Sequence, residues 1–265
     1  MHFTSERVLD DGIAEREFTL GDFTGILWTP PAASGSTPVP LIVLGQPGSI
    51  GTRHMYPRLA ARARRAAADG FAAVTIEPPG AGDRTPLPGA DDARADLGRA
   101  LAAGERPRTD LIDRLVLPLL EQAVPECRIT LDEVLGRPEI GDKVGLSGGV
   151  IAVGTRLAAV DPRIAAAGLF AGSYVPSVTM EEARLVTAPL HVLLQWDDES
   201  NDRRMALDLF DAFGSTEKTL CANTGGHTGV PQFAGEEAAR FFVRHLGSPP
   251  GEGSHNTSPL TDSDQ

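Results

Sequence analysis

The sequence predicts an α/β fold in which a mostly parallel, doubly wound sheet is flanked by helices. Three observations favour it: short apolar runs typical of strands buried on both faces, segments of helical periodicity between those runs, and turn-forming residues where the two meet. Strands that alternate with helices pack as a parallel sheet covered on both faces. The 265 residues are enough for one such domain, which we expect over residues 1–246.

An antiparallel hairpin is expected to precede the parallel strands. Side chains alternate along residues 17–28, and Gly21 and Asp22 are typical turn residues. Apolar runs predict buried strands at residues 41–44, 72–76, 142–146, 164–170 and 189–195. Helical patterns predict helices at residues 56–69, 91–103, 108–135, 150–160, 202–213 and 236–246. Proline lacks a backbone N–H, so Pro118 and Pro125 are expected to interrupt the third of these helices.

The acidic composition bears on the partners. The formal net charge is -12, and a chain of this charge repels phosphate backbones and anionic lipids. We therefore expect a small-molecule substrate, with neither nucleic acid nor a membrane as partner, although solubility alone is the plainer interpretation of the charge. No apolar run approaches the roughly 18 residues of a membrane helix. The polar N-terminus does not resemble a signal peptide, which predicts a cytoplasmic protein. The oligomeric state is not indicated.

Neither the cysteines nor the C-terminal tail indicates a catalytic or metal-binding site. Cys127 and Cys221 lack the spacing of metal ligands, so we predict no metal site and take them as buried or incidental thiols. Residues 247–265 are rich in Gly, Pro, Ser and Asp. Such a segment cannot bury much apolar surface, which predicts a disordered tail.

The pentapeptide Gly145-Leu146-Ser147-Gly148-Gly149 is the first candidate for chemistry. A strand pattern precedes it and a helix pattern follows it, as in the sharp turn that exposes a nucleophilic serine. In such an elbow we expect Ser147 to hold a strained backbone conformation, with small neighbours that avoid clashes. The alternative is a plain glycine-rich turn that binds phosphate at the helix N-terminus.

A nucleophilic serine needs a base, which is oriented in turn by a carboxylate. Three histidines follow Ser147 before the tail. His191 lies inside a strand pattern and His245 near the end of the last helix, so both fit structural roles. His227 follows two glycines in a loop before the last helix, where a catalytic base is expected, although an incidental loop histidine is the alternative.

The orienting acid is expected just after the fifth apolar run. Asp197, Asp198 and Glu199 lie there, and only one carboxylate can face the His227 ring. We favour Asp198, with Asp197 as second choice. An acidic turn that caps the following helix is the alternative interpretation.

These motifs resemble the α/β-hydrolase superfamily, and within it the dienelactone-hydrolase-like branch, over residues 18–246. The resemblance rests on the elbow at Ser147, the acidic turn after Leu194, the loop at His227, Asp161-Pro162-Arg163-Ile164, and the turn at residues 79–84. It implies a serine hydrolase without a cofactor, acting on a small ester, thioester or lactone through an acyl-enzyme on Ser147. It also favours Asp198 over Asp197. Dienelactone hydrolases use a cysteine nucleophile, so Ser147 argues against that narrow activity.

The resemblance also predicts an oxyanion hole. One backbone donor is expected from Gly148, after the nucleophile, and another from the loop after the first apolar run. Relatives often carry His-Gly-Gly in that loop, where this chain has Gln46-Pro47-Gly48-Ser49. Pro47 has no N–H, so Gly48 is the expected second donor, with Ser49 as the alternative. Gln46, Ser49 and Tyr174 are candidate pocket residues, and a structural aromatic is the alternative for Tyr174.

The spacing also limits what covers the site. Only residues 171–188 separate the fourth and fifth strands, which leaves room for one short helix and no large cap domain. The helical stretch between Arg84 and Leu135 is the best candidate for a cover. A peptidase or an acyltransferase fits the same triad. The altered oxyanion loop also permits a non-catalytic small-molecule binding protein of this fold.

Overall fold

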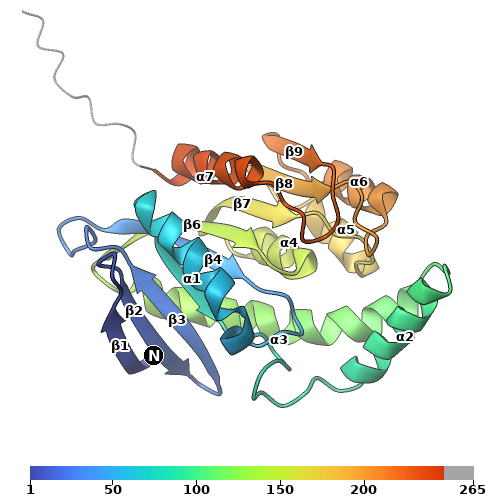
Figure 1. The fold of residues 1–265 in the computed structure, drawn as a ribbon, viewed down its shortest axis with the longest axis horizontal. Helices are drawn as coiled ribbons and strands as arrows, with labels where there is room; N and C mark the ends of the chain where they lie inside the picture. Colours follow the sequence, from blue (N-terminus) through green and yellow to red (C-terminus); the bar gives the residue numbers. More distant parts are fainter. Residues whose placement is uncertain (248–265) are drawn as a thin grey trace, which may run out of the picture.

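The protein was analysed as a computed structural model, which describes residues 1–247. It contains one nine-stranded sheet with the strand order β1-β2-β3-β5-β4-β6-β7-β8-β9 (Figure 1). The strands are β1 (His2–Val8), β2 (Ala14–Leu20), β3 (Phe23–Thr29), β4 (Val39–Gly45), β5 (Ala72–Ile76), β6 (Ile140–Gly148), β7 (Ile164–Phe170), β8 (Leu190–Gln195) and β9 (Lys218–Asn223). The helices are α1 (Thr52–Ala68), α2 (Ala90–Ala102), α3 (Thr109–Leu135), α4 (Ile151–Val160), α5 (Ser177–Ala183), α6 (Arg203–Ala212) and α7 (Gln232–Leu246).

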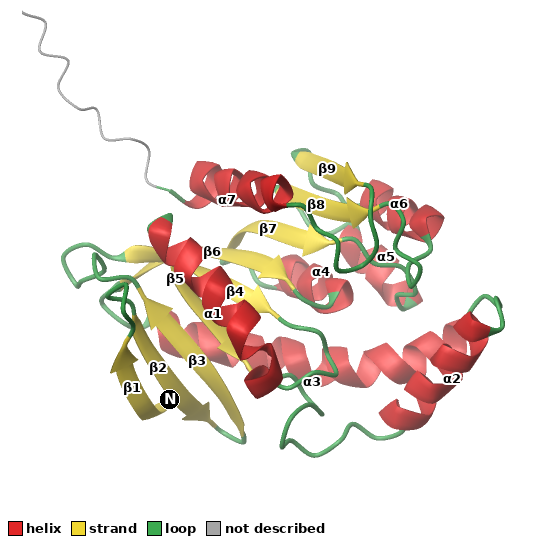
Figure 2. Ribbon diagram, viewed as in Figure 1, coloured by secondary structure: helices red, strands yellow, loops and turns green. Residues whose placement is uncertain are grey.

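In the spatial order of the sheet, neighbouring strands are antiparallel from β1 through β2 and β3 to β5. From β5 through β4, β6, β7 and β8 to β9, neighbouring strands are parallel. Helices α1 and α7 cover one face, and α3, α4, α5 and α6 pack on the other (Figure 2). Strand β4 shows the alternation: Ile42 and Leu44 belong to the core under α1 and α7, whereas Leu41 belongs to the opposite core. The predicted α/β class and doubly wound arrangement are therefore confirmed.

Most predicted elements are present with shifted ends. The hairpin, the five buried strands and the six helices all occur. Strand β1 was not predicted, because it is an exposed edge strand without apolar alternation. Strand β9 and the short helix α5 were not assigned either, although residues 171–188 leave room for one short helix, as expected.

Helix α3 differs from its prediction because it is continuous. It runs through both Pro118 and Pro125, which were expected to interrupt it. Each internal proline costs a helix about 3 kcal/mol. Leu119, Leu120 and Val124 lie beside the prolines and are all buried, so core packing offsets that cost.

Helix α1 begins four residues earlier than its periodicity indicates. The Thr52 N–H donates to both carboxylate oxygens of Glu77, at 3.1 and 3.0 Å. Glu77 is buried and follows β5, so this cap comes from a distant part of the chain. The predicted disordered tail lies outside the described residues, apart from Gly247. None of the described helices is long and apolar enough to cross a membrane.

Candidate active site

Ser147 lies near the end of β6, where the strand turns toward α4. It still pairs with Leu44 of β4 and Gly168 of β7. The prediction of a strained backbone at Ser147 is wrong, because the left-handed conformations fall on Gly148 (φ +65°) and Gly149 (φ +88°). Glycine adopts such angles without a steric penalty, so the turn needs no strain at the serine.

The elbow is too tight for side chains on its glycines. A Cβ on Gly149 would lie 2.8 Å from the Gly45 Cα, and one on Gly45 would lie 2.4 Å from the Gly148 oxygen. The small residues of the pentapeptide therefore allow β4 and the turn after β6 to approach closely, as an elbow requires.

Asp198 and His227 are brought together by two loops at the carboxyl ends of the strands. The Asp198 Oδ2 lies 2.7 Å from the His227 Nδ1, and the Asp198 Oδ1 accepts the Ser200 N–H at 3.0 Å. The Asp198 side chain is 2% exposed and the His227 side chain 64%. A buried carboxylate that holds one ring nitrogen leaves Nε2 directed elsewhere and available to another group.

Asp197 has a different role from Asp198. Its Oδ2 accepts the Gly225 N–H at 3.1 Å, and its own N–H donates to the Gly225 oxygen at 3.2 Å. Gln195 supports the same loop by donating to the Gly226 oxygen at 3.1 Å. Asp197 therefore fastens the loop that carries His227, while Asp198 contacts the ring.

Ser147 and His227 lie at the same end and on the same face of the sheet. Ser147 pairs with Gly168, and Phe170, two residues further along β7, shares that face. The His227 ring packs edge-on against Phe170, with the ring centroids 5.2 Å apart. Among the described residues, the one hydrogen bond to Ser147 Oγ comes from Arg62 Nη2 at 3.2 Å, and none joins Ser147 to His227. Catalytic hydrogen bonds often form only in the substrate complex.

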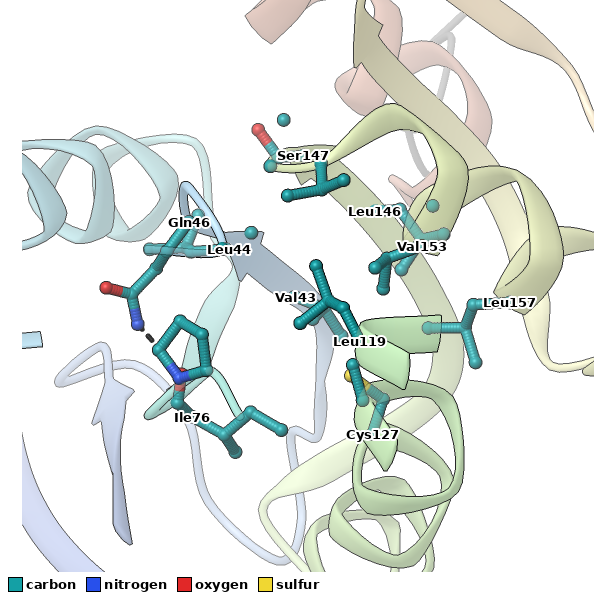
Figure 3. A pocket seen from close by; sticks show the side chains of 18 of the residues that line it. Val43, Leu44, Gln46, Ile76, Leu119, Cys127, Leu146, Ser147, Val153 and Leu157 are labelled. Carbon is teal, nitrogen blue, oxygen red and sulfur yellow. Dashed lines mark hydrogen bonds between the residues drawn. The ribbon is translucent and has the colours of Figure 1, made fainter. Parts of the chain in front are cut away.

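A cavity of about 80 Å³ opens beside the elbow, on the opposite side from the Ser147 hydroxyl. Figure 3 shows the Ser147 Oγ directed away from Val43, Leu119 and Cys127. Burial raises the pKa of the Cys127 thiol to about 12, so the thiol is neutral and the wall apolar. The apolar lining side chains from β4, β5, β6, α3 and α4 include Val43, Ile76, Leu119, Ala123, Cys127, Leu146, Val153 and Leu157. Helix α3, part of the stretch expected to cover the site, thus forms one wall.

Only some of the predicted oxyanion and pocket residues reach this cavity. Gly48, Gly148 and Gln46 line it, whereas Ser49 and Tyr174 do not. Ser49 points to solvent. Tyr174 lies on the loop after β7 with a left-handed φ of 52°, and burial and the nearby Asp202 raise the pKa of its hydroxyl. Ser49 and Tyr174 therefore lie outside this cavity, and their place in a substrate pocket stays a prediction.

Gln46 has a bracing role that the sequence did not indicate. Its Nε2 donates to the Thr52 Oγ1 at 2.9 Å, the Thr75 Oγ1 at 3.0 Å and the Ile76 oxygen at 2.8 Å. The amide is buried, and its Oε1 has no hydrogen-bond partner. Gln46 thus ties the end of β4 to β5 and α1 at the cavity rim.

The structure also places two residues at the site that sequence reasoning missed. Arg62 reaches the elbow from α1, and Gln195 supports the His227 loop from β8. Arg62 lies in an arginine-rich helix that is typical of a solvated surface, so no local signal identified it. The two histidines to which the sequence pattern assigned structural roles do not contact Ser147. His191 is buried against Phe241, and burial lowers its pKa, whereas His245 contacts Glu217.

Comparisons with known proteins agree with this geometry at the level of the fold. No protein-family model matches the chain, and no curated protein does. Among solved structures, a cold-adapted esterase from an Arctic intertidal metagenomic library is similar with a TM-score of 0.70 and 23% identity, over 93% of this chain and 100% of the other. The acetyl xylan esterase 1 of a Thermoanaerobacterium species is similar with a TM-score of 0.59 and 14% identity, over 91% and 86% of the two chains.

A third similar structure is a dienelactone hydrolase from Anabaena variabilis, with a TM-score of 0.56 and 17% identity, over 91% of this chain and 98% of the other. These likenesses extend over nearly the whole of each chain. They agree with the mostly parallel, helix-covered sheet described above. The chain therefore has the α/β-hydrolase fold, in its dienelactone-hydrolase-like form.

Proposed function

We propose that this protein is a serine hydrolase that cleaves small carboxylic esters, with Ser147 as nucleophile, His227 as base and Asp198 as the orienting acid. The observation that carries the proposal is the 2.7 Å contact between Asp198 and His227, at the same end of the sheet as Ser147. The similar folds of two esterases support an ester substrate. Ser147 in place of cysteine favours an ester over a dienelactone.

The proposed reaction follows from this arrangement. With Asp198 on its Nδ1–H, His227 takes the hydroxyl proton of Ser147 on Nε2 while Oγ bonds to the acyl carbon. The carbonyl electron pair moves onto oxygen, which the N–H groups of Gly148 and Gly48 stabilise. The oxyanion then collapses, and the alkoxy group leaves with the proton from His227. Water, activated by His227, hydrolyses the acyl-enzyme in the same way.

In this proposal the Ser147 side chain rotates about χ1, so that Oγ, which now points away from the cavity beside the elbow, delivers a short acyl group into it. The cavity volume of about 80 Å³ is roughly half that of an engineered cavity of about 150 Å³ that accommodates benzene. Its walls are apolar and contain no ionised group, so a charged acyl chain would lose its hydration without a partner. An acetyl to butyryl group fits these limits.

A second candidate function is ligand binding without catalysis. The Ser147 Oγ contacts Arg62 rather than His227, and the Ser147 backbone is unstrained. Both features are compatible with a fold that keeps the pocket without the chemistry.

Labelling with a fluorophosphonate tests the proposal and separates it from the second candidate. We expect the wild-type protein to be labelled and Ser147→Ala to be unlabelled. Ser5→Ala, on the exposed edge strand β1, is the matched control and should label like the wild type. Nitrophenyl acetate, butyrate and octanoate then test the acyl size, with octanoate expected to be the poorest. A folded wild-type protein that takes no label would refute the hydrolase proposal, and ligand binding would be the remaining candidate function.

A further inference from the structure

A guanidinium from α1 contacts the proposed nucleophile. Arg62 Nη1 donates to the Gly45 oxygen at 2.8 Å, and Nη2 donates to the Ser147 oxygen and, at 3.2 Å, to the Ser147 Oγ. One side chain thus joins the ends of two adjacent parallel strands and touches the reacting hydroxyl. The planar guanidinium holds its N–H donors in a rigid fork, whereas a lysine ammonium is a compact charge on a flexible stem.

The position of Arg62 on α1 is unusual for a cation. Leu59 and Ala66, which lie on the same face of the helix, are both buried against the sheet. The other arginines of this segment point outward: Arg64 pairs with Asp11 and Arg65 with Asp69. Arg62 is therefore directed inward on the apolar face of an otherwise solvated helix.

The charge of Arg62 is not neutralised by an ion pair. Within the described part of the chain, no carboxylate lies within ion-pair distance of its guanidinium, which donates to two carbonyl oxygens and the Ser147 hydroxyl. Burial lowers the pKa of Arg62 to about 10, which leaves it protonated at neutral pH. An uncompensated cation at this place favours any negative charge that develops on Ser147.

The elbow is also shaped to admit the guanidinium. A Cβ on Gly148 would lie 3.2 Å from Arg62 Nη2, closer than nearly all such contacts. Gly148 thus serves the left-handed turn and leaves room for Arg62. The contact is built into the strand-turn geometry and does not depend on a mobile surface side chain.

We propose that Arg62 is a catalytic residue that stabilises negative charge on the Ser147 Oγ as its proton moves to His227. The inference rests on the proposed function. Arg62 keeps all its protons: the proton passes from Oγ to the His227 Nε2, and the Oγ electron pair forms the bond to the acyl carbon. The guanidinium is already charged, so its attraction for Oγ grows as Oγ gains negative charge.

The test compares neutral and charged replacements by fluorophosphonate inactivation, which separates the binding constant KI from the bond-forming rate constant kinact. Arg62→Gln and Arg62→Met remove the charge, and we expect kinact to fall about 10- to 100-fold with KI unchanged. Arg62→Lys keeps the charge but lacks the planar, two-pronged arrangement of N–H groups. We expect its kinact to fall about three- to tenfold, with KI unchanged. Arg58→Gln, one turn away on the exposed side of α1, is the matched control and should react like the wild type. Thermal unfolding identifies the variants that fold.

When the neutral variants fold, two results would overturn the role of Arg62. One is a folded neutral variant that reacts at the wild-type rate. The other is a loss that is equal in the Lys and neutral variants, since that indicates a structural brace rather than a charge. If the neutral variants do not fold, a Lys variant whose loss lies in KI rather than kinact also refutes it. Failure of the proposed function is distinct, because then the wild-type protein itself takes no label.

Discussion

Replacing Asp198 with Asn should abolish most of the activity while leaving the fold intact. The Asp198 carboxylate serves two donors at once, the His227 Nδ1–H on Oδ2 and the Ser200 N–H on Oδ1. The amide of Asn has a single oxygen. If that oxygen remains on the Ser200 N–H, the amide NH2 faces Nδ1, which must then carry the lone pair. The ring proton moves to Nε2, and His227 can no longer accept the proton of Ser147.

The magnitude follows from this change of tautomer. The same replacement in a serine protease triad lowers kcat by about 10⁴. At about 1.36 kcal/mol for each factor of ten, that is about 5 kcal/mol of barrier. Because the Asp198 side chain is almost fully buried, water cannot replace the missing carboxylate oxygen, so we expect a loss of about 10³- to 10⁴-fold. The assay is the steady-state hydrolysis of nitrophenyl acetate, with KM close to the wild-type value and unchanged thermal unfolding.

Asp197→Asn is the matched control. Asp197 is the adjacent residue with the same side chain, and its Oδ2 holds the Gly225 N–H rather than the ring. Its replacement should cost less than about tenfold, since a neutral amide oxygen still accepts from a backbone N–H. A larger loss for Asp197→Asn than for Asp198→Asn would refute the assignment of Asp198 and transfer the role to Asp197.

Three further predictions concern the pocket and the core. Ala123→Phe should fill the cavity and lower kcat/KM for nitrophenyl butyrate at least tenfold more than for the acetate, measured with both esters. Burial raises the pKa of Cys127 to about 12, so Cys127 in the native protein at pH 7.5 should react with iodoacetamide at least 100-fold more slowly than in the urea-unfolded chain, as followed by mass spectrometry of the peptide that contains it. Hydrogen bonds from Arg163 lower the pKa of the buried Asp161. Its stabilising effect is therefore present above the unfolded pKa of about 3.9 and is lost as pH falls through the folded value. Asp161→Asn should cost about 3 kcal/mol in urea unfolding at pH 7 and less at pH 3.

Strands β4 to β8 could be predicted because their signal is local. Leu41 to Leu44 is an uninterrupted apolar run, and Ala72 to Ile76 has Thr75 as its one polar residue. Strands buried on both faces require such runs. Strand β1 carries no such signal, since it lies at the sheet edge and only Phe3 is partly covered. The early start of α1 was equally hidden, because its cap, Glu77, comes from the end of β5.

The candidate site likewise has residues that the sequence indicates and residues that only the tertiary structure reveals. Chain order and loop position indicated His227 and narrowed the acid to the turn after β8, where Asp198 was favoured and Asp197 was the second choice. The structure places Asp198 in contact with His227. The backbone of Ser147 was misjudged because a pentapeptide pattern does not indicate which residue takes the turn, and Gly148 and Gly149 take it here. Arg62 was beyond reach of the sequence, since only the tertiary fold distinguishes it from the other arginines of its helix.

The position of α7 determines when the site can form. Its Phe242 packs directly on the glycines of β6 and β7: a Cβ on Gly145 or Gly168 would come within 3.0 Å of that ring. This helix is the last described element of the chain. While it is still in the ribosomal tunnel, a nascent polypeptide lacks the side chains that pack against Gly145 and Gly168 beneath the elbow. Domains fold as units during synthesis, and here the unit is completed by its final segment. Stalled nascent chains that end before residue 232 should therefore take no fluorophosphonate label, and reactivity should appear only once α7 has emerged.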